Sequence, residues 1–153
     1  QHMIYLYNYA GQPWKAQQRV REVMDKLYSP TPDGLCGDED NGQTSAWYVF
    51  SAMGFYPVCP GAGEYVIGAP LFQKITLKLE NGKTFEIQAP QNSKDNLYIQ
   101  SATFNGKPYT RTYLRHDAIQ AGGTVRFEMG PQPNTQWGTA PEDAPYSMSL
   151  ENR

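Results

Sequence analysis

The chain contains little cysteine and matches no pattern for zinc binding. Two of its 153 residues are cysteines, Cys36 and Cys59, so at most one disulfide can form. Two thiols at this spacing fit no zinc signature, which needs four ligands. The pattern leaves open a bridge or a pair of structural thiols, and we expect the thiols. Cysteine by itself therefore provides neither a disulfide framework nor a metal site.

The chain also lacks a large charge excess and a long hydrophobic run. Its formal net charge of −2 argues against electrostatic binding to nucleic acid or to anionic lipid. No apolar run approaches the roughly 20 residues of a membrane-spanning helix. The first residues have no secretory-signal pattern, and residues 3–7 already resemble buried structure. We therefore expect a fragment of a longer protein, with no nucleic-acid partner and no membrane span.

Aromatic residues, in contrast, are abundant. They make up 13% of the chain, with 11 Tyr and 3 Trp, while charged residues make up only 18%. Because aromatic rings stack on the apolar faces of sugars, this bias favours a carbohydrate ligand. A β-rich domain with many tyrosines on its strands would have the same composition.

The first half of the chain has the periodicity of helices. Apolar residues recur on one face between Val20 and Tyr28, and Pro13 suits the first turn of that helix. The Pro- and Gly-containing residues 29–34 are expected to end it. Residues 3–10 are apolar nearly all round, which predicts an earlier helix that is buried on most sides.

Another helix is predicted from about residue 43 onwards. Thr44 or Ser45 could cap its start, and Gly54 is placed to follow its last turn. We expect the nearby aromatic residues to be core more often than a platform for sugar. The predicted apolar stripe consists of Ala46, Val49, Phe50 and Met53, widened by Trp47 and Tyr48.

The second half of the chain changes to a period of two, which is typical of strands. Residues 74–80 and 84–88 alternate around an Asn-Gly pair, the strongest short signal for a hairpin. Residues 97–104 precede a second Asn-Gly turn, and residues 111–116 and 124–129 have the pattern of further strands. Short strands at this spacing predict an antiparallel β-sandwich. The fold class is therefore α+β, with a helical unit followed by a sandwich and a boundary near residues 57–65.

Three carboxyl groups, those of Asp38, Glu39 and Asp40, lie between Gly37 and Gly42. Glycines permit a tight backbone and the close approach of a ligand. Asp38 and Asp40 are two residues apart, so an extended backbone would point both side chains the same way. Crowded carboxylates repel one another, so a cation, a sugar hydroxyl or a catalytic water would explain their presence.

Three interpretations of this acidic segment compete. An EF-hand loop needs Gly at its sixth position and Glu at its twelfth, but counting from Asp38 gives Gln43 and Val49. An acidic turn that caps the following helix is a second interpretation, because negative charge is favourable at a helix N-terminus. The third is a glycosidase site, in which carboxyl groups flank the scissile bond. The pattern alone excludes the first and leaves the other two open.

The surroundings of the acidic segment resemble one enzyme family. Residues 34–58 contain Gly-Leu-Cys-Gly-Asp-Glu-Asp-Asn-Gly-Gln and end in Met-Gly-Phe-Tyr-Pro-Val, and they resemble the signature of the family 92 glycoside hydrolases. Residues 2–14 resemble a second block of that family. Residues 68–72, 92–101 and 134–138 resemble its C-terminal pattern, so the resemblance covers nearly the whole chain.

The resemblance implies a fold and an activity. That family comprises inverting exo-α-mannosidases that need calcium, and it pairs an N-terminal β-sandwich with an (α/α)6 barrel. Residues 1–57 would be the last helices of the barrel, and residues 58–153 would be a C-terminal sandwich layer. The implied substrates are mannose-containing glycans with terminal α-mannosyl residues, α-1,2 linkages first, as in N-glycan degradation. The implied location is periplasmic or secreted in a bacterium, and the rest of the parent chain would be the main partner.

The resemblance also assigns the catalytic base. In the family's Gly-Asp-x-Asp motif the aspartates activate the attacking water, and these positions correspond to Asp38 and Asp40. We expect Asp40 to be the base and Asp38 to share or orient the water. Glu39 would project elsewhere, and the general acid would be a glutamate on an upstream segment outside this chain.

Three further residues are candidate contacts to substrate. His2 matches the second member of a family His pair, although Gln1 stands where the first would be. Asn41 and Gln43 could donate hydrogen bonds to sugar or to the aspartates, or could cap the helix. Calcium would hold the 2- and 3-hydroxyl groups of mannose, and the resemblance names no calcium ligand within these residues.

The chain alone should therefore be inactive, because the acid and most of the pocket would lie elsewhere. A rival interpretation is a non-catalytic β-sandwich domain, either carbohydrate-binding or structural, with the helices as a platform.

Overall fold

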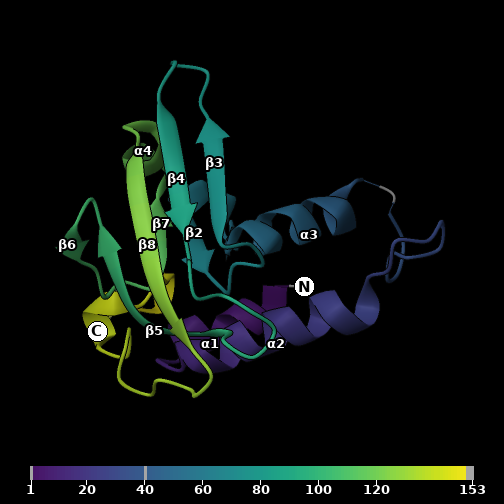
Figure 1. Cartoon of the computed structure of the whole chain (residues 1–153), viewed down its shortest axis with the longest axis horizontal. Helices are drawn as coiled ribbons and strands as arrows, with labels where there is room; N and C mark the ends of the chain where they lie inside the picture. The colour runs from purple at the N-terminus through teal and green to yellow at the C-terminus, as the bar shows by residue number, and fades with distance from the viewer. Residues whose placement is uncertain (1, 40, 151–153) are drawn as a thin grey trace.

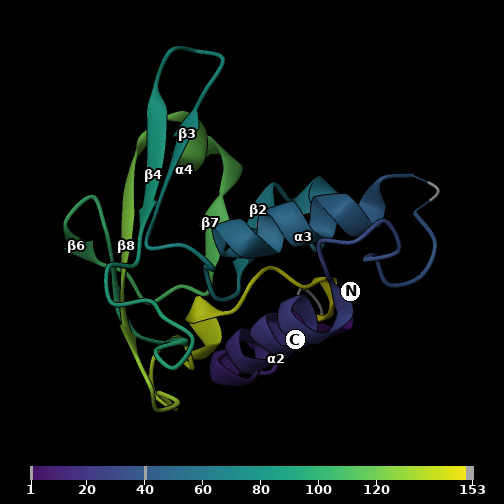
Figure 2. The ribbon, with the colours of Figure 1, turned by 45° about the vertical axis from the view of Figure 1, so that its right-hand side comes forward.

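The computed structural model describes residues 2–39 and 41–150 and contains both helices and sheets. Two long helices lie side by side and project from two β-sheets (Figures 1 and 2). Among the described residues, no helix combines the length and the hydrophobicity needed to cross a membrane. The chain begins with helical segments η1 (His2–Tyr5) and α1 (Leu6–Tyr9), and continues with α2 (Pro13–Leu27) and α3 (Gln43–Met53).

Helix α2 has the bounds that its periodicity predicts. Pro13 occupies its first turn, where a missing N–H costs nothing. Its buried apolar side chains recur every four residues, as one face of a helix requires. They are those of Ala16, Val20 and Met24.

The helical segment at the start is correctly predicted as helical, but its burial is not. Met3 is 78% exposed and Leu6 is 50% exposed, whereas Tyr5 and Asn8 are fully buried. The prediction of a helix buried on most sides is therefore wrong for this chain. Only the face toward α2 and the first sheet is covered.

Helix α3 ends as expected but begins differently. Gly54 follows it with φ of 104°, a left-handed conformation that glycine adopts without a steric penalty. At the other end Gly42 occupies the N-cap position with φ of 66° and no side-chain cap of its own, so neither Thr44 nor Ser45 is the cap. The predicted stripe is also wrong at Ala46 and Val49, which are exposed.

The buried face of α3 lies on its other side. It is formed by Thr44, Trp47, Ser51 and Ala52. Trp47 is fully buried, which confirms that it is core. Apolar periodicity could not predict this face, because two of its residues, Thr44 and Ser51, are polar.

The strands form two sheets. The first has the order β1-β2-β7 and is antiparallel throughout. The second has the order β3-β4-β8-β5-β6. The bounds are β1 Phe55–Tyr56, β2 Glu64–Ile67, β3 Lys74–Lys78, β4 Thr84–Gln88, β5 Tyr98–Phe104, β6 Lys107–Pro108, β7 Tyr113–Arg115 and β8 Gly123–Gly130.

Both predicted hairpins are present. Strands β3 and β4 pair antiparallel around Gly82, whose φ is 81°. Strands β5 and β6 pair around Asn105 and Gly106, with φ of 50° and 80°. Two successive residues with positive φ match the twist of a two-residue hairpin, which explains the Asn-Gly pair.

The expectation of a wholly antiparallel arrangement is wrong at one pair of strands. Strand β8 pairs parallel with β4 and antiparallel with β5. Strand β8 lies between strands of the two hairpins, and local turn signals cannot specify such a long-range insertion. A short helix, α4 (His116–Gln120), precedes β8 and was not predicted. Three further 3-10 turns complete the fold, at η2 (Pro60–Ala62), η3 (Pro141–Asp143) and η4 (Met148–Leu150).

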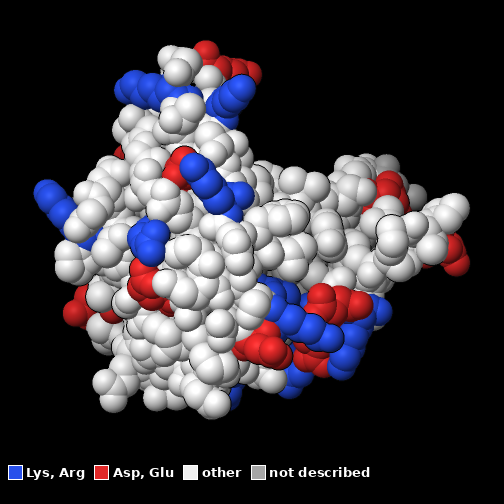
Figure 3. All heavy atoms as spheres, viewed as in Figure 1, with Lys and Arg blue, Asp and Glu red and all other residues white. Residues whose placement is uncertain are grey.

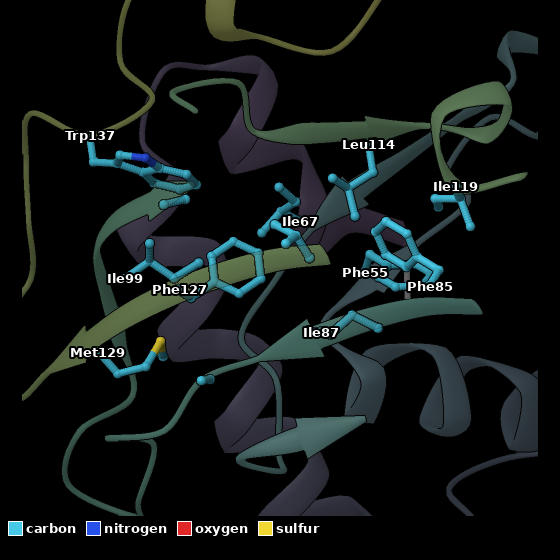
Figure 4. Packing of buried hydrophobic residues seen from close by; sticks show 13 residues of the cluster. Phe55, Ile67, Phe85, Ile87, Ile99, Leu114, Ile119, Phe127, Met129 and Trp137 are labelled. Atoms are coloured by element: carbon cyan, nitrogen blue, oxygen red, sulfur yellow. The ribbon is translucent and has the colours of Figure 1, made fainter. Parts of the chain in front are cut away.

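Side chains from both sheets share one hydrophobic cluster (Figure 4). Phe55, Ile67 and Leu114 come from the first sheet. Trp137 closes one end, so its predicted packing role is confirmed. The second sheet and its connections contribute Phe85, Ile87, Ala89, Ile99, Ala102, Val125, Phe127 and Met129, with Ile119 from α4.

A second cluster joins the helices to the first sheet. Its members come from η1, α2, α3, β1 and β2, and they include Tyr5, Val20, Trp47, Tyr56 and Val66. Strand β1 lies before the predicted boundary at residues 57–58, yet it is part of the first sheet. The division into two domains stays a prediction. Both cysteines are free thiols, Cys36 half-buried and Cys59 exposed, as expected.

Candidate active site

The acidic segment lies in the loop of residues 28–42, which joins α2 to α3 at the ends farthest from the sheets (Figure 1). The sequence has no Lys or Arg between Lys26 and Lys74. On the face seen in Figure 3, the projecting loop carries acidic side chains and no basic ones. The loop is therefore a region of uncompensated negative charge.

The first part of this loop is closed by its own backbone. The N–H of Ser29 donates to the carbonyl of Gly34 at 2.9 Å, and the N–H of Gly34 donates to Thr31 at 2.9 Å. A Cβ atom at Gly34 would lie 1.8 Å from the carbonyl oxygen of Ser29. Only glycine fits there. The sequence predicted that residues 29–34 end the helix, but it gives no signal for the closed loop that requires glycine at this position.

An aromatic stack anchors the loop to α3. The ring of Tyr28 lies 5.6 Å from that of Trp47, nearly parallel to it, and 4.9 Å from that of Tyr48. The Tyr28 hydroxyl donates to the backbone carbonyl of Thr44 at 3.2 Å. Because Trp47 is fully buried, the stack ties the start of the loop to the core.

Glu39 binds the N-terminus of α3. Its two carboxylate oxygens accept the backbone N–H of Ser45 at 3.0 and 3.2 Å. Hydrogen bonds from Ser45, with smaller contributions from Thr44, lower the pKa of Glu39 below its ordinary value. The N-terminal end of the helix dipole favours this negative charge. The helix-capping interpretation of the acidic turn is thus correct for one of its carboxylates.

Asp38 is held differently. Its backbone carbonyl accepts the hydroxyl of Thr44 at 3.3 Å, while its side chain is exposed. Within the described part of the chain, its carboxylate forms no hydrogen bond or ion pair. Asp40, the other predicted catalytic residue, lies outside the described residues.

The predicted sugar contacts are only partly brought together. Asn41 and Gln43 are exposed and stand on either side of the N-cap glycine, close to Asp38 in sequence. His2 is exposed, and its ring meets that of Tyr56 edge-on at 5.4 Å. No described contact joins His2 to the acidic loop.

A groove of about 510 Å³ lies beside the loop and is mainly apolar. Tyr28, Leu35, Tyr48 and Val49 line it, and none of the described carboxylates does. The described residues also contain no complete set of side-chain ligands for a metal ion. In residues 2–39 and 41–150, no three His, Cys, Asp or Glu side chains gather where they could hold an ion. The residues described here do not by themselves fit a calcium site.

Comparisons with known proteins identify the family. A family model for the glycosyl hydrolase family 92 catalytic domain matches residues 1–131. The chain therefore belongs to glycosyl hydrolase family 92.

Solved structures and one curated relative agree with this assignment. A family GH92 inverting mannosidase from Bacteroides thetaiotaomicron is 59% identical, with a TM-score of 0.92 over 97% of this chain and 20% of its own. A GH92 alpha-mannosidase from the same organism, in complex with mannoimidazole, is 44% identical, with a TM-score of 0.91 over 96% of this chain and 19% of its own. An uncharacterized secreted glycosidase from Arthroderma benhamiae is 35% identical over 94% of this chain and 19% of its own length. The chain spans about a fifth of the length of these relatives.

Proposed function

We propose that this chain carries the catalytic base of an exo-α-mannosidase that hydrolyses terminal α-mannosyl residues with inversion. One observation carries the proposal: adjacent carboxylates in a family 92 chain have different partners. Glu39 is bound to the N-terminus of α3, whereas the carboxylate of Asp38 is exposed and has no described partner. The 59% identity to a structure named as an inverting mannosidase supports the stereochemistry.

The proposed reaction needs a water molecule and two carboxyl groups. In inverting glycosidases the base and the acid lie about 6.5–9.5 Å apart, which leaves room for the water. Asp40 takes a proton from this water while the water oxygen forms a bond to the anomeric carbon. Asp38 accepts a hydrogen bond from the second O–H of the same water, which stays on the product, and so orients the water. A glutamate on another segment of the parent chain donates its proton to the glycosidic oxygen as the bond to the leaving group breaks.

Calcium belongs to the proposal, although residues 2–39 and 41–150 contain no complete set of ligands for it. Bound calcium would hold the 2- and 3-hydroxyl groups of mannose, with ligands from other parts of the parent enzyme. No step assigned here to Asp38 or Asp40 depends on it. Asn41 and Gln43 are proposed as contacts to sugar, because they are exposed beside Asp38. His2 is proposed as a contact only within the complete enzyme.

The architecture of the parent follows from the same proposal. Residues 1–57 would be the last helices of an (α/α)6 barrel, and residues 58–153 a β-sandwich layer beside it. Exposed apolar side chains on the helices, such as Met3 (78%) and Val49 (57%), support contact with the rest of the parent chain.

We further propose mannose-containing glycans as substrates, α-1,2 linkages first. A secreted location is supported by the Arthroderma relative, and a bacterial periplasmic one is the finer proposal.

Asparagine variants of the full-length parent enzyme test the base. We expect Asp40→Asn to lower kcat by about 100- to 10,000-fold, the usual contribution of a general base, and Asp38→Asn to lower it less. The matched control is Asp33→Asn, which removes an exposed carboxylate from the same loop. The measurement is the kcat of each variant for a mannoside with a good leaving group.

Two results would contradict the proposal. Near-normal turnover by Asp40→Asn would overturn the assignment of the base. Binding of mannose to the β half of the chain, retained without calcium and unaffected by either variant, would favour a non-catalytic carbohydrate-binding domain.

A further inference from the structure

We propose that Glu39 and Thr44 are positioning residues that hold the catalytic aspartates at a fixed place relative to α3. This inference rests on the function proposed above and concerns the residue that separates the two aspartates. Neither residue is assigned contact with substrate. Both act through the backbone that carries Asp38 and Asp40.

Two side chains join the acidic segment to the helix by hydrogen bonds, and they reach in opposite directions. The side chain of Glu39 reaches from the loop to the backbone N–H of Ser45, at 3.0 and 3.2 Å. The side chain of Thr44 reaches from the helix to the backbone carbonyl of Asp38, at 3.3 Å. These bonds fix the residue before Asp40 by its side chain and the residue before that by its backbone.

The helix to which they attach is itself held in place. Thr44 is only 3% exposed, and Trp47, one turn further on, is fully buried. The Tyr28 hydroxyl bonds to the carbonyl of Thr44 at 3.2 Å. The first turn of α3 is therefore held in place by the core, and the acidic segment is attached to this turn.

The segment needs such a support because glycines flank it. Gly37 and Gly42 have φ of 76° and 66°, a conformation that glycine reaches easily but that leaves the chain free to take many others. The side-chain hydrogen bonds supplement the bond from the Gly42 N–H to the backbone carbonyl of Glu39, at 3.3 Å, in connecting the segment to the start of α3. A catalytic base with many accessible conformations would seldom be aligned with the anomeric carbon.

The charge of Glu39 supports the same role. A third carboxylate between two aspartates would repel both if it pointed the same way. Bound to the N-terminus of α3, its charge interacts favourably with the helix dipole instead.

Substitutions at Glu39 in the full-length parent test the first bond. We expect Glu39→Ala to lower kcat and kcat/KM together by about 10- to 100-fold, since a displacement of about 1 Å can cost 100-fold. Glu39→Gln keeps an acceptor for the Ser45 N–H and should restore most of the rate. Asp33→Ala is the control, because it removes a carboxylate from the same loop but no described hydrogen bond.

Substitutions at Thr44 test the second bond. Thr44→Val has nearly the same shape but no hydroxyl, and should lower kcat in the same direction as Glu39→Ala. Thr44→Ser keeps the hydroxyl and should restore it. Thermal unfolding of each variant checks that the enzyme is folded at the assay temperature.

Azide separates positioning from catalysis. This anion attacks the anomeric carbon without a base, so it should accelerate Asp40→Asn. Glu39→Ala retains the base, and azide should leave its rate unchanged. Acceleration of Glu39→Ala to the extent seen for Asp40→Asn would overturn the inference, because it would make Glu39 the base.

Other outcomes are equally decisive. If Glu39→Ala and Thr44→Val both keep the wild-type kcat, or change only KM, the inference is wrong. If Asp40→Asn and Asp38→Asn lose activity while these variants do not, only the positioning role fails. If the aspartate variants remain active, the proposed function fails first.

Discussion

At the scale of single residues, the described carboxylates of the acidic segment have different surroundings. Glu39 binds the helix N-terminus, and Asp38 presents an exposed carboxylate from a backbone that Thr44 fixes. Asp38 and Glu39 thus have different partners, although they are adjacent and have nearly identical chemistry. The sequence left an acidic turn that caps the following helix open as one interpretation, without indicating that Glu39 would form the cap.

The cap formed by Glu39 should depend on pH. Its pKa in the folded chain is lower than in the unfolded chain, mainly because of hydrogen bonds from Ser45. The unfolded state therefore binds more protons between the two pKa values, and stability rises with pH there. The contribution is fully present above the unfolded pKa and is lost as pH falls through the folded pKa.

Thermal unfolding of the wild type and of Glu39→Gln, from neutral pH down to about pH 3, measures this effect. We expect the wild type to be more stable above its unfolded pKa and the difference in Tm to vanish toward acid pH. A difference that grows as pH falls would contradict the assigned cap.

The sequence predicted some residue roles well because their causes are local. The left-handed Gly54 and the Asn105-Gly106 turn follow from backbone sterics over a few residues. Gly34 could not be predicted in the same way. Its constraint is the carbonyl of Ser29, which approaches only once the loop is closed.

At the scale of elements, buried polar side chains join the helices to the sheets. Gln17 is 1% exposed, and its side-chain oxygen accepts the N–H of Ile99 at 2.9 Å. Arg21 donates to the carbonyl of Pro70 at 2.6 Å and to the side chain of Asn92 at 2.8 Å. Asn8 donates to the carbonyl of Ile67 at 2.8 Å. These contacts hold α1 and α2 against both sheets.

Gln17 should therefore be important for the local stability of β5. Gln17→Met keeps the volume of the side chain but leaves the N–H of Ile99 buried and unpaired, which costs about 1–3 kcal/mol. We expect faster hydrogen exchange in peptides that span β5, measured by mass spectrometry on the full-length enzyme. The matched control is Gln18→Met, on the exposed neighbour, which should exchange as the wild type does. Equal exchange in both variants would show that the contact contributes little.

Element prediction succeeded where periodicity was strong and failed where tertiary context decides. Helix α2 and the β3–β4 hairpin have the predicted type and order. The apolar stripe of α3 was misplaced because its buried face includes Thr44 and Ser51, whose polar groups find partners only in the fold. The parallel pairing of β4 with β8 joins residues far apart in the sequence, and no turn signal encodes it.

At the scale of the whole molecule, the chain is about a fifth of the length of its family 92 relatives. Its two hydrophobic clusters make the helices and both sheets one packed body. Several large apolar side chains nevertheless stay exposed on the helical side, among them Met3, Leu6, Leu27 and Val49. Under the proposed function, these side chains face the remainder of the catalytic domain.

Residues 1–153 alone should not hydrolyse mannosides. The proposed general acid and most of the sugar pocket lie on other segments, and a base without its acid protonates no leaving group. The measurement is turnover of an unactivated α-1,2-linked mannobiose by the purified chain, beside the full-length parent at equal concentration. Hydrolysis by the chain that disappears in Asp40→Asn would contradict the proposed division of the site.

The most direct test of the account is the product that the full-length Asp40→Asn variant forms in azide. If Asp40 is the base of an inverting enzyme, azide should restore turnover, and the first product should be the β-mannosyl azide, identified by its NMR spectrum. Wild-type enzyme in water should release β-mannose first. An α-configured product, or wild-type turnover by Asp40→Asn without azide, would contradict the assignment of the acidic loop as the base of this enzyme.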